Sequence, residues 1–125
     1  MTFTEFAEAL KNTDEVEITV TGRTSGRKIS TPVWFVSEAE TLYLLPVKGS
    51  DSAWFKNILK TPTMRLSADG KEWTAEVKPV TDKAAVQSIV EKFRKKYGAD
   101  QVKKYYSKFD VAVDVSYAGN QRRSA

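Results

Sequence analysis

The amino-acid sequence predicts an α+β fold that is mostly β, in which about six strands close into an antiparallel barrel with helices at its periphery. Several short segments alternate apolar and polar residues with the period of a half-buried strand. These segments follow one another through short turns, which favours antiparallel pairing, and no strand–helix–strand unit typical of a parallel sheet is evident. Closure into a barrel would leave no exposed sheet edge.

One domain is expected over residues 1–119, followed by a polar tail at 120–125. The domain opens with a short helix, for which Thr2 and Glu5 form a capping box. A glycine-rich loop and a polar turn then separate three expected strands. These strands lie at 14–21, 29–36 and 41–47, the loop at 22–28 and the turn at 37–40.

The second half of the chain combines a hairpin with three helical segments. A helix begins after Asp51 or Ser52, either of which can cap it, and its apolar face carries Trp54, Phe55, Ile58 and Leu59. The pair Asp69-Gly70 predicts a tight hairpin between strands near 64–68 and 73–77. The longest helix is expected at 82–97, ended by Gly98 in the left-handed conformation; a short helix near 99–108 and a strand with Val111, Val113 and Val115 follow.

The composition excludes several kinds of catalysis. The 125 residues include no histidine and no cysteine, so no serine–histidine or cysteine–histidine nucleophile can form, and no metal site is expected. An enzyme of this composition would use an organic cofactor, or else carboxylates, lysines and tyrosines alone. The net charge of +4 suits a small anionic ligand, and equally it could serve solubility.

The sequence carries no long apolar run and no basic-plus-apolar segment at its start, so no membrane span and no signal peptide are expected. The absence of cysteine fits a cytoplasmic protein.

The loop from Gly22 to Lys28 is the first candidate anion site. Its two glycines allow several N–H groups to face one point, and three cations and two hydroxyl groups accompany them. The alternative is a solvated cationic turn, and the sequence leaves both interpretations open. Lys48-Gly49-Ser50 is a second candidate, because a helix start with free N–H groups follows it. If both loops border one barrel mouth, they could bind one anionic ligand together.

The three tryptophans are the largest aromatic surfaces. Trp73 lies on an alternating strand and is expected in the core, whereas Trp34 and Trp54 each follow a cationic loop and could flank a planar ring. A basic stretch at 94–96 and 103–104 lies beside three tyrosines, which is one pattern of single-stranded nucleic-acid binding. Because an apolar stripe underlies this stretch, its lysines are better explained as a solvated helix face, and no nucleic-acid partner is expected.

Four motifs in order resemble the deazaflavin-dependent nitroreductase and quinone reductase family. That family carries a G-R-x-[ST]-G loop, an x-P-x-aromatic strand, a K-G-G loop and a W-Y-x-N-L-x-x-N-P helix. The corresponding segments here are Gly22-Arg23-Thr24-Ser25-Gly26, Thr31-Pro32-Val33-Trp34, Lys48-Gly49, and the helix with Trp54, Asn57 and Pro62. The resemblance extends from about residue 16 to 117.

The resemblance implies a split β-barrel, similar to FMN-binding proteins of the pyridoxine-phosphate-oxidase type. It further implies a bound deazaflavin coenzyme (factor 420) or FMN, and hydride transfer to a small acceptor such as a quinone or nitro compound. Residues implied to bind the cofactor are Arg23, Thr24, Ser25, Lys28, Trp34, Val47, Lys48, Gly49 and Trp54. Residues implied to lie near the substrate are Trp34, Tyr97 and Tyr105.

The chain departs from the family pattern at three positions. Thr24 and Ile29 stand where the family often has lysine and arginine, although Arg27 and Lys28 lie close enough to substitute, and Ser50 replaces a glycine. These departures leave the choice between deazaflavin and FMN open. They also leave open a non-catalytic cofactor- or ligand-binding protein, with a nucleic-acid-binding barrel as a third alternative. Dimers are common among FMN-type split barrels, so a homodimer is consistent with the resemblance.

Overall fold

The computed structural model describes residues 3–38 and 41–116. Its strands are β1 (Glu15–Thr21), β2 (Lys28–Glu38), β3 (Thr41–Leu44), β4 (Thr63–Ala68), β5 (Lys71–Val80) and β6 (Ala112–Ser116). Its helices are α1 (Phe3–Leu10), α2 (Ala53–Lys60), α3 (Lys83–Tyr97) and α4 (Ala99–Tyr105), with a single 3₁₀ turn, η1, at Gly49–Asp51. The predicted fold class, a mostly-β α+β barrel with peripheral helices, is confirmed.

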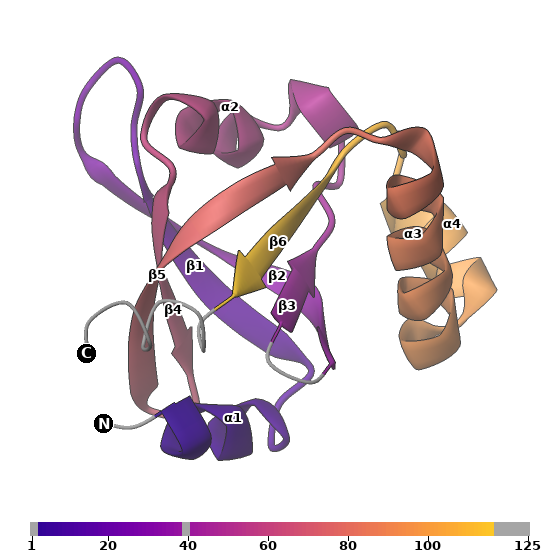
Figure 1. The fold of residues 1–125 in the computed structure, drawn as a ribbon, viewed down its shortest axis with the longest axis horizontal. Helices are drawn as coiled ribbons and strands as arrows, with labels where there is room; N and C mark the ends of the chain where they lie inside the picture. The colour runs from indigo at the N-terminus through magenta and orange to yellow at the C-terminus, as the bar shows by residue number, and fades with distance from the viewer. Residues whose placement is uncertain (1–2, 39–40, 117–125) are drawn as a thin grey trace.

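The strands form one closed antiparallel barrel in the order β1-β2-β3-β6-β5-β4 (Figure 1). Two long strands are shared between its two sheets. The strand β2 pairs with β1 as far as Trp34 and with β3 from Phe35 onward, while β5 changes partner from β4 to β6 after Glu76. These partner changes split the barrel, and in the described part of the chain the first half of β2 pairs only with β1.

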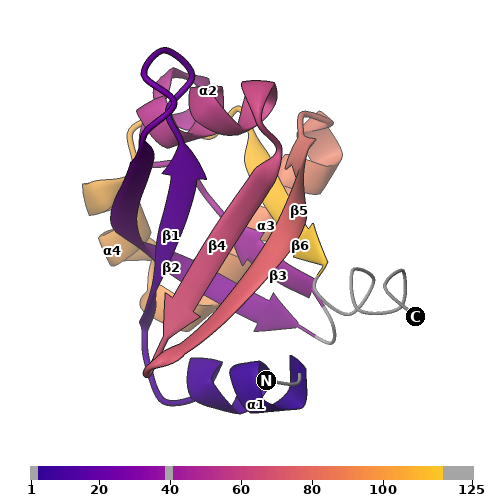
Figure 2. The ribbon, with the colours of Figure 1, turned by 90° about the vertical axis from the view of Figure 1, so that its left-hand side faces the viewer.

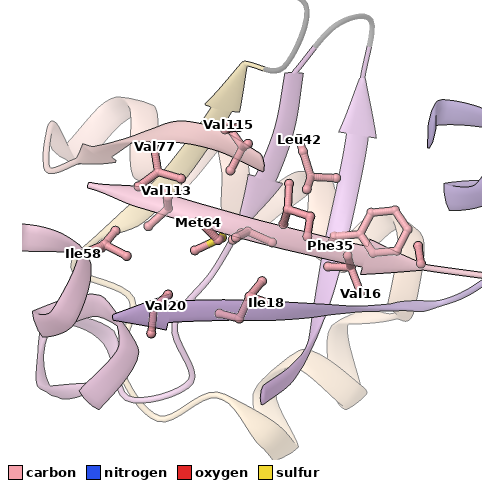
Figure 3. Packing of buried hydrophobic residues seen from close by; sticks show 14 of the residues in the cluster. Val16, Ile18, Val20, Phe35, Leu42, Ile58, Met64, Val77, Val113 and Val115 are labelled. Carbon is pink, nitrogen blue, oxygen red and sulfur yellow. The ribbon is translucent and has the colours of Figure 1, made fainter. Parts of the chain in front are cut away.

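The barrel interior is filled by the alternating apolar residues of its strands (Figure 3). Ile18 of β1, Leu42 of β3 and Val113 of β6 are fully buried there, as the period of two predicts. Ile58 of α2 and Phe6 of α1 belong to the same cluster, and both are fully buried. The two helices lie at opposite ends of the barrel, so each end is closed by a helix (Figure 2).

A second apolar layer lies outside the barrel, where α3 and α4 cover β2, β3 and β6 (Figure 1). Phe93 of α3 and Val102 of α4 are fully buried in it, together with Ala112 of β6. The side chain of Asp82 accepts a hydrogen bond from the Ala85 N–H and caps α3. This layer places the tyrosines at the end of α3 and α4 beside β2.

Several local predictions hold. Asp69 and Gly70 both have positive φ (48° and 77°), as a type I′ hairpin turn requires. The expected strands and helices all form, with ends that shift by a few residues. The predicted capping role of Thr2, the domain end at 119 and the tail at 120–125 lie outside the described residues.

Four predictions of local detail are wrong. The strand β3 ends at Leu44 instead of 47, because Pro46 has no N–H with which to continue the ladder. Leu59 is 58% exposed, and the buried face of α2 carries Asn57 in addition to Phe55 and Ile58. Gly98 ends α3 at φ +97° and ψ 138°, outside the left-handed helical region. Ser52 is the N-cap residue of α2, but its side chain makes no capping hydrogen bond.

Candidate functional site

A cavity of about 660 Å³ lies between β2, the start of α2 and α4. Ligand pockets commonly have volumes of this order. Its wall is mainly apolar and aromatic, with a few polar groups. The lining residues are Glu15, Thr31, Pro32, Val33, Trp34, Leu45, Val47, Lys48, Ser52, Ala53, Trp54, Gln101, Tyr105 and Tyr106.

Trp34 is the centre of an aromatic cluster on the β2 side of this cavity. Its ring stacks on the ring of Tyr97, with centroids 4.2 Å apart and planes 6° from parallel. Tyr105 meets Trp34 edge to face at 5.5 Å, and Tyr106 lies 5.9 Å away. Stacked and edge-to-face aromatic pairs are favourable arrangements, so the indole of Trp34 is held on several sides by α3 and α4.

The hydroxyl group of Tyr97 lies where β2 changes partner. It accepts a hydrogen bond from the Phe35 N–H (3.1 Å) and can donate to the carbonyl oxygen of Phe35 (2.8 Å) or of Asp14 (2.7 Å). Burial raises the pKa of Tyr97 to about 12, so this phenol is protonated at neutral pH. Tyr97 stacks on Trp34 and is not itself part of the cavity wall.

The start of α2 and Lys48 form the cationic end of the cavity. Lys48 is exposed at the rim, and its N–H donates to Ser52 Oγ at 2.9 Å. This bond occupies the hydroxyl that would otherwise cap the helix. The first N–H groups of α2 therefore remain available next to a lysine, an arrangement that favours an anion. Glu15 at another part of the wall supplies a negative charge.

The Lys48–Asp51 loop already contacts an anionic group within the protein. Asp110, between α4 and β6, accepts hydrogen bonds from the Ser50 N–H at 3.0 Å and from Ser50 Oγ at 2.5 Å. The hydroxyl of Ser50, more than any other contact, lowers the pKa of Asp110 below its ordinary value. Gly49 is buried in this turn with φ +55°. The donors of Ser50 are thus used internally, which leaves Lys48 and α2 as the groups that face the cavity.

The Gly22–Lys28 loop is attached to α2 by Arg23. The Arg23 N–H and guanidinium both donate to Asn57 Oδ1, at 3.1 and 2.8 Å, and the guanidinium lies 3.4 Å from the Ala53 carbonyl oxygen. Lys60 donates in return to the Arg23 carbonyl oxygen. The loop consequently lies beside α2 at the same end of the barrel (Figure 2).

Most backbone donors of this loop have partners within the loop or on α2. The N–H groups of Gly22, Gly26 and Arg27 donate to Arg27 O, Gly22 O and Ser25 Oγ, respectively. Thr24, Ser25, Arg27 and Lys28 are exposed, and Lys28 Nζ donates to Thr21 Oγ1. An anion would therefore meet the loop mainly through its exposed cations and hydroxyl groups.

The structure brings together part of the predicted site. Five of the predicted residues line the cavity: Trp34, Val47, Lys48, Trp54 and Tyr105. The others do not line it: Arg23, Thr24, Ser25, Lys28, Gly49 and Tyr97. Arg23 nevertheless contacts Ala53, a residue of the wall, so the two cationic loops meet at α2 instead of at an open mouth.

Sequence reasoning assigned no role to two residues that organise the site, Asn57 and Asp110. Asn57 is 4% exposed on an otherwise apolar helix face, and a polar residue in that position was a visible signal. Asp110 is 60 residues from Ser50 in sequence, and no local pattern predicts this pairing.

Among the described residues, no group of three or more acidic, histidine or cysteine side chains could hold a metal ion. No helix in residues 3–38 and 41–116 has the length and apolar character needed to cross a membrane.

The sequence matches the model of a known family. A sequence model of the family described as "Uncharacterized protein conserved in bacteria (DUF2255)" matches residues 7–115. None of the curated proteins matches the chain.

Solved structures share the fold at low sequence identity. An F420-H2 dependent reductase (FDR-A) gives a TM-score of 0.64 at 19% identity, over 82% of this chain and 93% of that chain. A structure described as a "domain-swapped dimer" gives 0.65 at 16% identity, over 91% and 99%. HutZ, the heme storage protein from Vibrio cholerae, gives 0.66 at 12% identity, over 91% and 88%. These matches confirm, at the level of the fold, the split barrel and the resemblance to deazaflavin-dependent reductases.

Proposed function

The chain belongs to the bacterial family described as "Uncharacterized protein conserved in bacteria (DUF2255)", and we propose that it is a reductase that binds a deazaflavin or FMN in the cavity between β2, α2 and α4. In this proposal the reduced cofactor passes a hydride to a small acceptor such as a quinone or a nitro compound. One observation carries it: a planar aromatic platform, Trp34, lines the same cavity as Lys48 and the first turn of α2.

The residues of the cavity fit the two chemical parts of such a cofactor. The indole of Trp34 is held by Tyr97 and Tyr105, so its ring is a fixed surface for a flat heteroaromatic ring system. Lys48 and the uncapped start of α2 supply a positive charge and N–H donors for a phosphate. The bound cofactor would supply the hydride, which is consistent with a chain that has no histidine.

The loop at 22–28 would bind the distal part of a longer cofactor tail. Arg23 contacts Ala53 in the cavity wall, and the exposed Arg27 and Lys28 follow it in the same loop. A tail that leaves the cavity across the start of α2 would meet these cations next. In this proposal Arg23 mainly holds the loop on α2, while Arg27 and Lys28 bind the negative charge of the cofactor tail.

The proposal is tested by titration of the protein with FMN and with a deazaflavin coenzyme, followed by the fluorescence of its three tryptophans. Saturable quenching by one of them is expected. Lys48→Ala should weaken this binding by about tenfold, the effect of losing one charge-assisted hydrogen bond. Lys56→Ala is the matched control, because Lys56 is exposed on α2 and is not part of the cavity wall.

Arg23→Ala should weaken binding as well, because the loop loses the guanidinium contacts with Asn57 Oδ1 and the Ala53 carbonyl oxygen. If both cofactors fail to bind, or if Lys48→Ala and Arg23→Ala bind like the wild type, this site is not the cofactor site. Binding followed by reduction of a quinone or nitro acceptor with the reduced cofactor would establish the enzyme.

A non-catalytic binding protein is the second candidate, favoured by the similarity in fold to a heme storage protein. Heme iron is usually held by histidine or cysteine, and this chain has neither, so a flavin-type ligand is the better fit for the cavity. Cofactor binding without turnover of any acceptor would favour this function. A nucleic-acid-binding barrel is less favoured, because Lys92 and Arg94 of α3 pair with acidic residues; salt-sensitive binding of an oligonucleotide would support it.

A homodimer is the assembly that we propose for this protein. The first half of β2 pairs only with β1 among the described residues, and it carries the exposed Ile29 and Pro32. One of the structures with this fold is described as a domain-swapped dimer. Light scattering after size exclusion should give twice the 14.1 kDa mass of one chain, whereas a mass of 14.1 kDa would show a monomer.

A further inference from the structure

Asp110 lies between α4 and β6 and reaches back to the turn that follows β3. One of its carboxylate oxygens accepts the Ser50 N–H at 3.0 Å, and the other accepts the Ser50 hydroxyl at 2.5 Å. A single carboxylate therefore binds both the backbone and the side chain of one residue. Bonds to an ionised acceptor are the stronger kind of protein hydrogen bond.

The turn is shaped to receive this carboxylate. Gly49 has φ +55°, and a Cβ atom at this position would lie 2.1 Å from Asp110 Oδ1. That Cβ atom would also lie 3.0 Å from Cγ of Lys108. Asp110 thus packs directly against the backbone of Gly49, and a residue with a side chain at position 49 would displace it.

Further contacts join the turn after β3 to the segment after α4, in addition to the contact between Asp110 and Ser50. Ser107 N–H donates to the Val47 carbonyl oxygen at 2.8 Å. The ammonium of Lys108 lies 3.2 Å from Asp51 and 3.7 Å from Asp110. Lys48 lies between these attachment points, so its backbone is held before and after it.

Both joined segments contribute residues to the wall of the cavity. Val47 and Lys48 come from one segment, and Tyr105 and Tyr106, which precede Ser107, come from the other. The Lys48 N–H also donates to Oγ of Ser52, the N-cap residue of α2. A shift of the turn would therefore move the lysine and the helix start relative to the aromatic wall.

We propose that Asp110 is a positioning residue for the anion-binding end of the cavity, which it sets by fixing the Lys48–Ser52 segment against the end of α4. Asp110 does not line the cavity and acts through Lys48 and the start of α2. The proposal rests on the proposed function, because it assumes that a phosphate is bound there. A preorganised site loses less entropy when its ligand binds, so loosening the turn should weaken affinity for the anion.

Paired probes separate positioning from a general loss of structure. FMN carries a phosphate and riboflavin does not, and both present the same ring to Trp34. Asp110→Ala is expected to weaken FMN binding by about tenfold and riboflavin binding by less than about twofold. Asp100→Ala, an exposed aspartate on α4, is the control and should leave both affinities unchanged. Equal losses for the two probes would overturn the proposal.

A double-mutant cycle tests whether Asp110 acts through Lys48. If it does, Asp110→Ala should have little further effect on FMN binding in the Lys48→Ala background. Independent, additive losses would contradict the proposal. Should Asp110→Ala fail to fold, Asp110→Asn replaces it, since the amide oxygen can still accept the Ser50 N–H, while the charge and the acceptor of the Ser50 hydroxyl are lost. An intermediate loss confined to FMN is then expected.

A different outcome would distinguish this proposal from the proposed function. If the wild type binds neither FMN nor the deazaflavin, the proposed function is wrong. Inorganic phosphate then serves as the probe, followed by the amide NMR shift of Lys48. A saturable shift in the wild type that Asp110→Ala weakens by about tenfold would support positioning. The absence of any shift, or an equal shift in the variant, would overturn it.

Discussion

The indole ring of Trp34 lies parallel to the phenol ring of Tyr97, with centroids 4.2 Å apart and planes 6° from parallel. The two residues come from different layers, Trp34 from β2 of the barrel and Tyr97 from the last turn of α3. Because the Tyr97 hydroxyl also binds the backbone of Phe35, one side chain supports both the aromatic wall and the point where β2 changes partner. The candidate site thus depends on the outer helical layer as much as on the barrel.

Removal of the Tyr97 hydroxyl should destabilise the fold and leave the ring stack in place. Tyr97→Phe keeps the aromatic ring but leaves the Phe35 N–H without this acceptor. We expect the free energy of unfolding in urea to fall by about 1–2 kcal/mol, the usual range for a lost buried hydrogen bond. The near-ultraviolet circular dichroism of Trp34 should change little. Tyr105→Phe is the control, because Tyr105 is 50% exposed, and equal stability of both variants would contradict this role of Tyr97.

The buried phenol of Tyr97 should make the folded protein less stable in alkali. Burial, the largest cause, raises the pKa of Tyr97 to about 12 in the folded protein, whereas a tyrosine in the unfolded chain titrates near pH 10. Between these values the unfolded chain has released a proton that the folded protein still holds, so the free energy of unfolding decreases as pH rises through this window. The full contribution of the Tyr97 phenol to the free energy of unfolding is present below about pH 10.

Urea unfolding of the wild type and Tyr97→Phe at about pH 9, 10 and 11 measures this contribution. The stability advantage of the wild type should shrink as pH rises, because the variant has no phenol at position 97. Other groups that titrate in this range are present in both proteins and cancel in the difference, except Tyr106, whose pKa is raised mainly by burial and also by the charge of Tyr97. A constant difference across the series would show that Tyr97 titrates normally in the folded state.

The sequence allows the barrel to be predicted because its signal is local. Ile18 and Leu66 each alternate with polar neighbours, and that period of two determines which side chains enter the core. The Asp69-Gly70 turn then determines the register of β4 and β5. These features require no knowledge of distant residues, so the fold class could be predicted from the pattern alone.

The candidate site is only partly predictable, because its organising contacts join distant residues. Trp34 and Lys48 could be identified as candidates from their residue type and their position after a loop, and both line the cavity. The helical period places Tyr97 on the buried stripe of α3, but it does not indicate that the hydroxyl reaches Phe35, 62 residues away. The partner of Asp110 is equally hidden, since it depends on how β6 returns beside β3.

Asn57 should hold the Gly22–Lys28 loop in place. Its buried Oδ1 accepts two hydrogen bonds from Arg23, so Asn57→Ala leaves both donors without this partner. We expect a loss of about 1–3 kcal/mol in the free energy of unfolding. Trypsin should also cleave the loop faster in the native state, because the loop contains Arg23, Arg27 and Lys28.

Lys56→Ala provides the control for this variant, since Lys56 neighbours Asn57 on α2 and is exposed. It should match the wild type in both stability and cleavage rate. If Asn57→Ala lowers stability while native-state cleavage in the loop stays at the wild-type rate, Asn57 does not restrain the loop.

A comparison of alanine substitutions at Gly26 and Gly49 separates the energy of the contact between Asp110 and Gly49 from the energy of backbone strain. Gly26 has φ +73° and open space where a Cβ would lie, whereas at Gly49, with φ +55°, the Cβ would collide with Asp110. Gly26→Ala should therefore cost only about 1–2 kcal/mol of conformational strain. Gly49→Ala should cost about 1–3 kcal/mol more, because the carboxylate and Lys108 must also move. Asp110→Ala in the Gly49→Ala background should recover part of that excess, and thermal unfolding of the variants measures each step. Equal losses for the two glycine variants would mean that the turn shifts freely, and that Asp110 does not hold it.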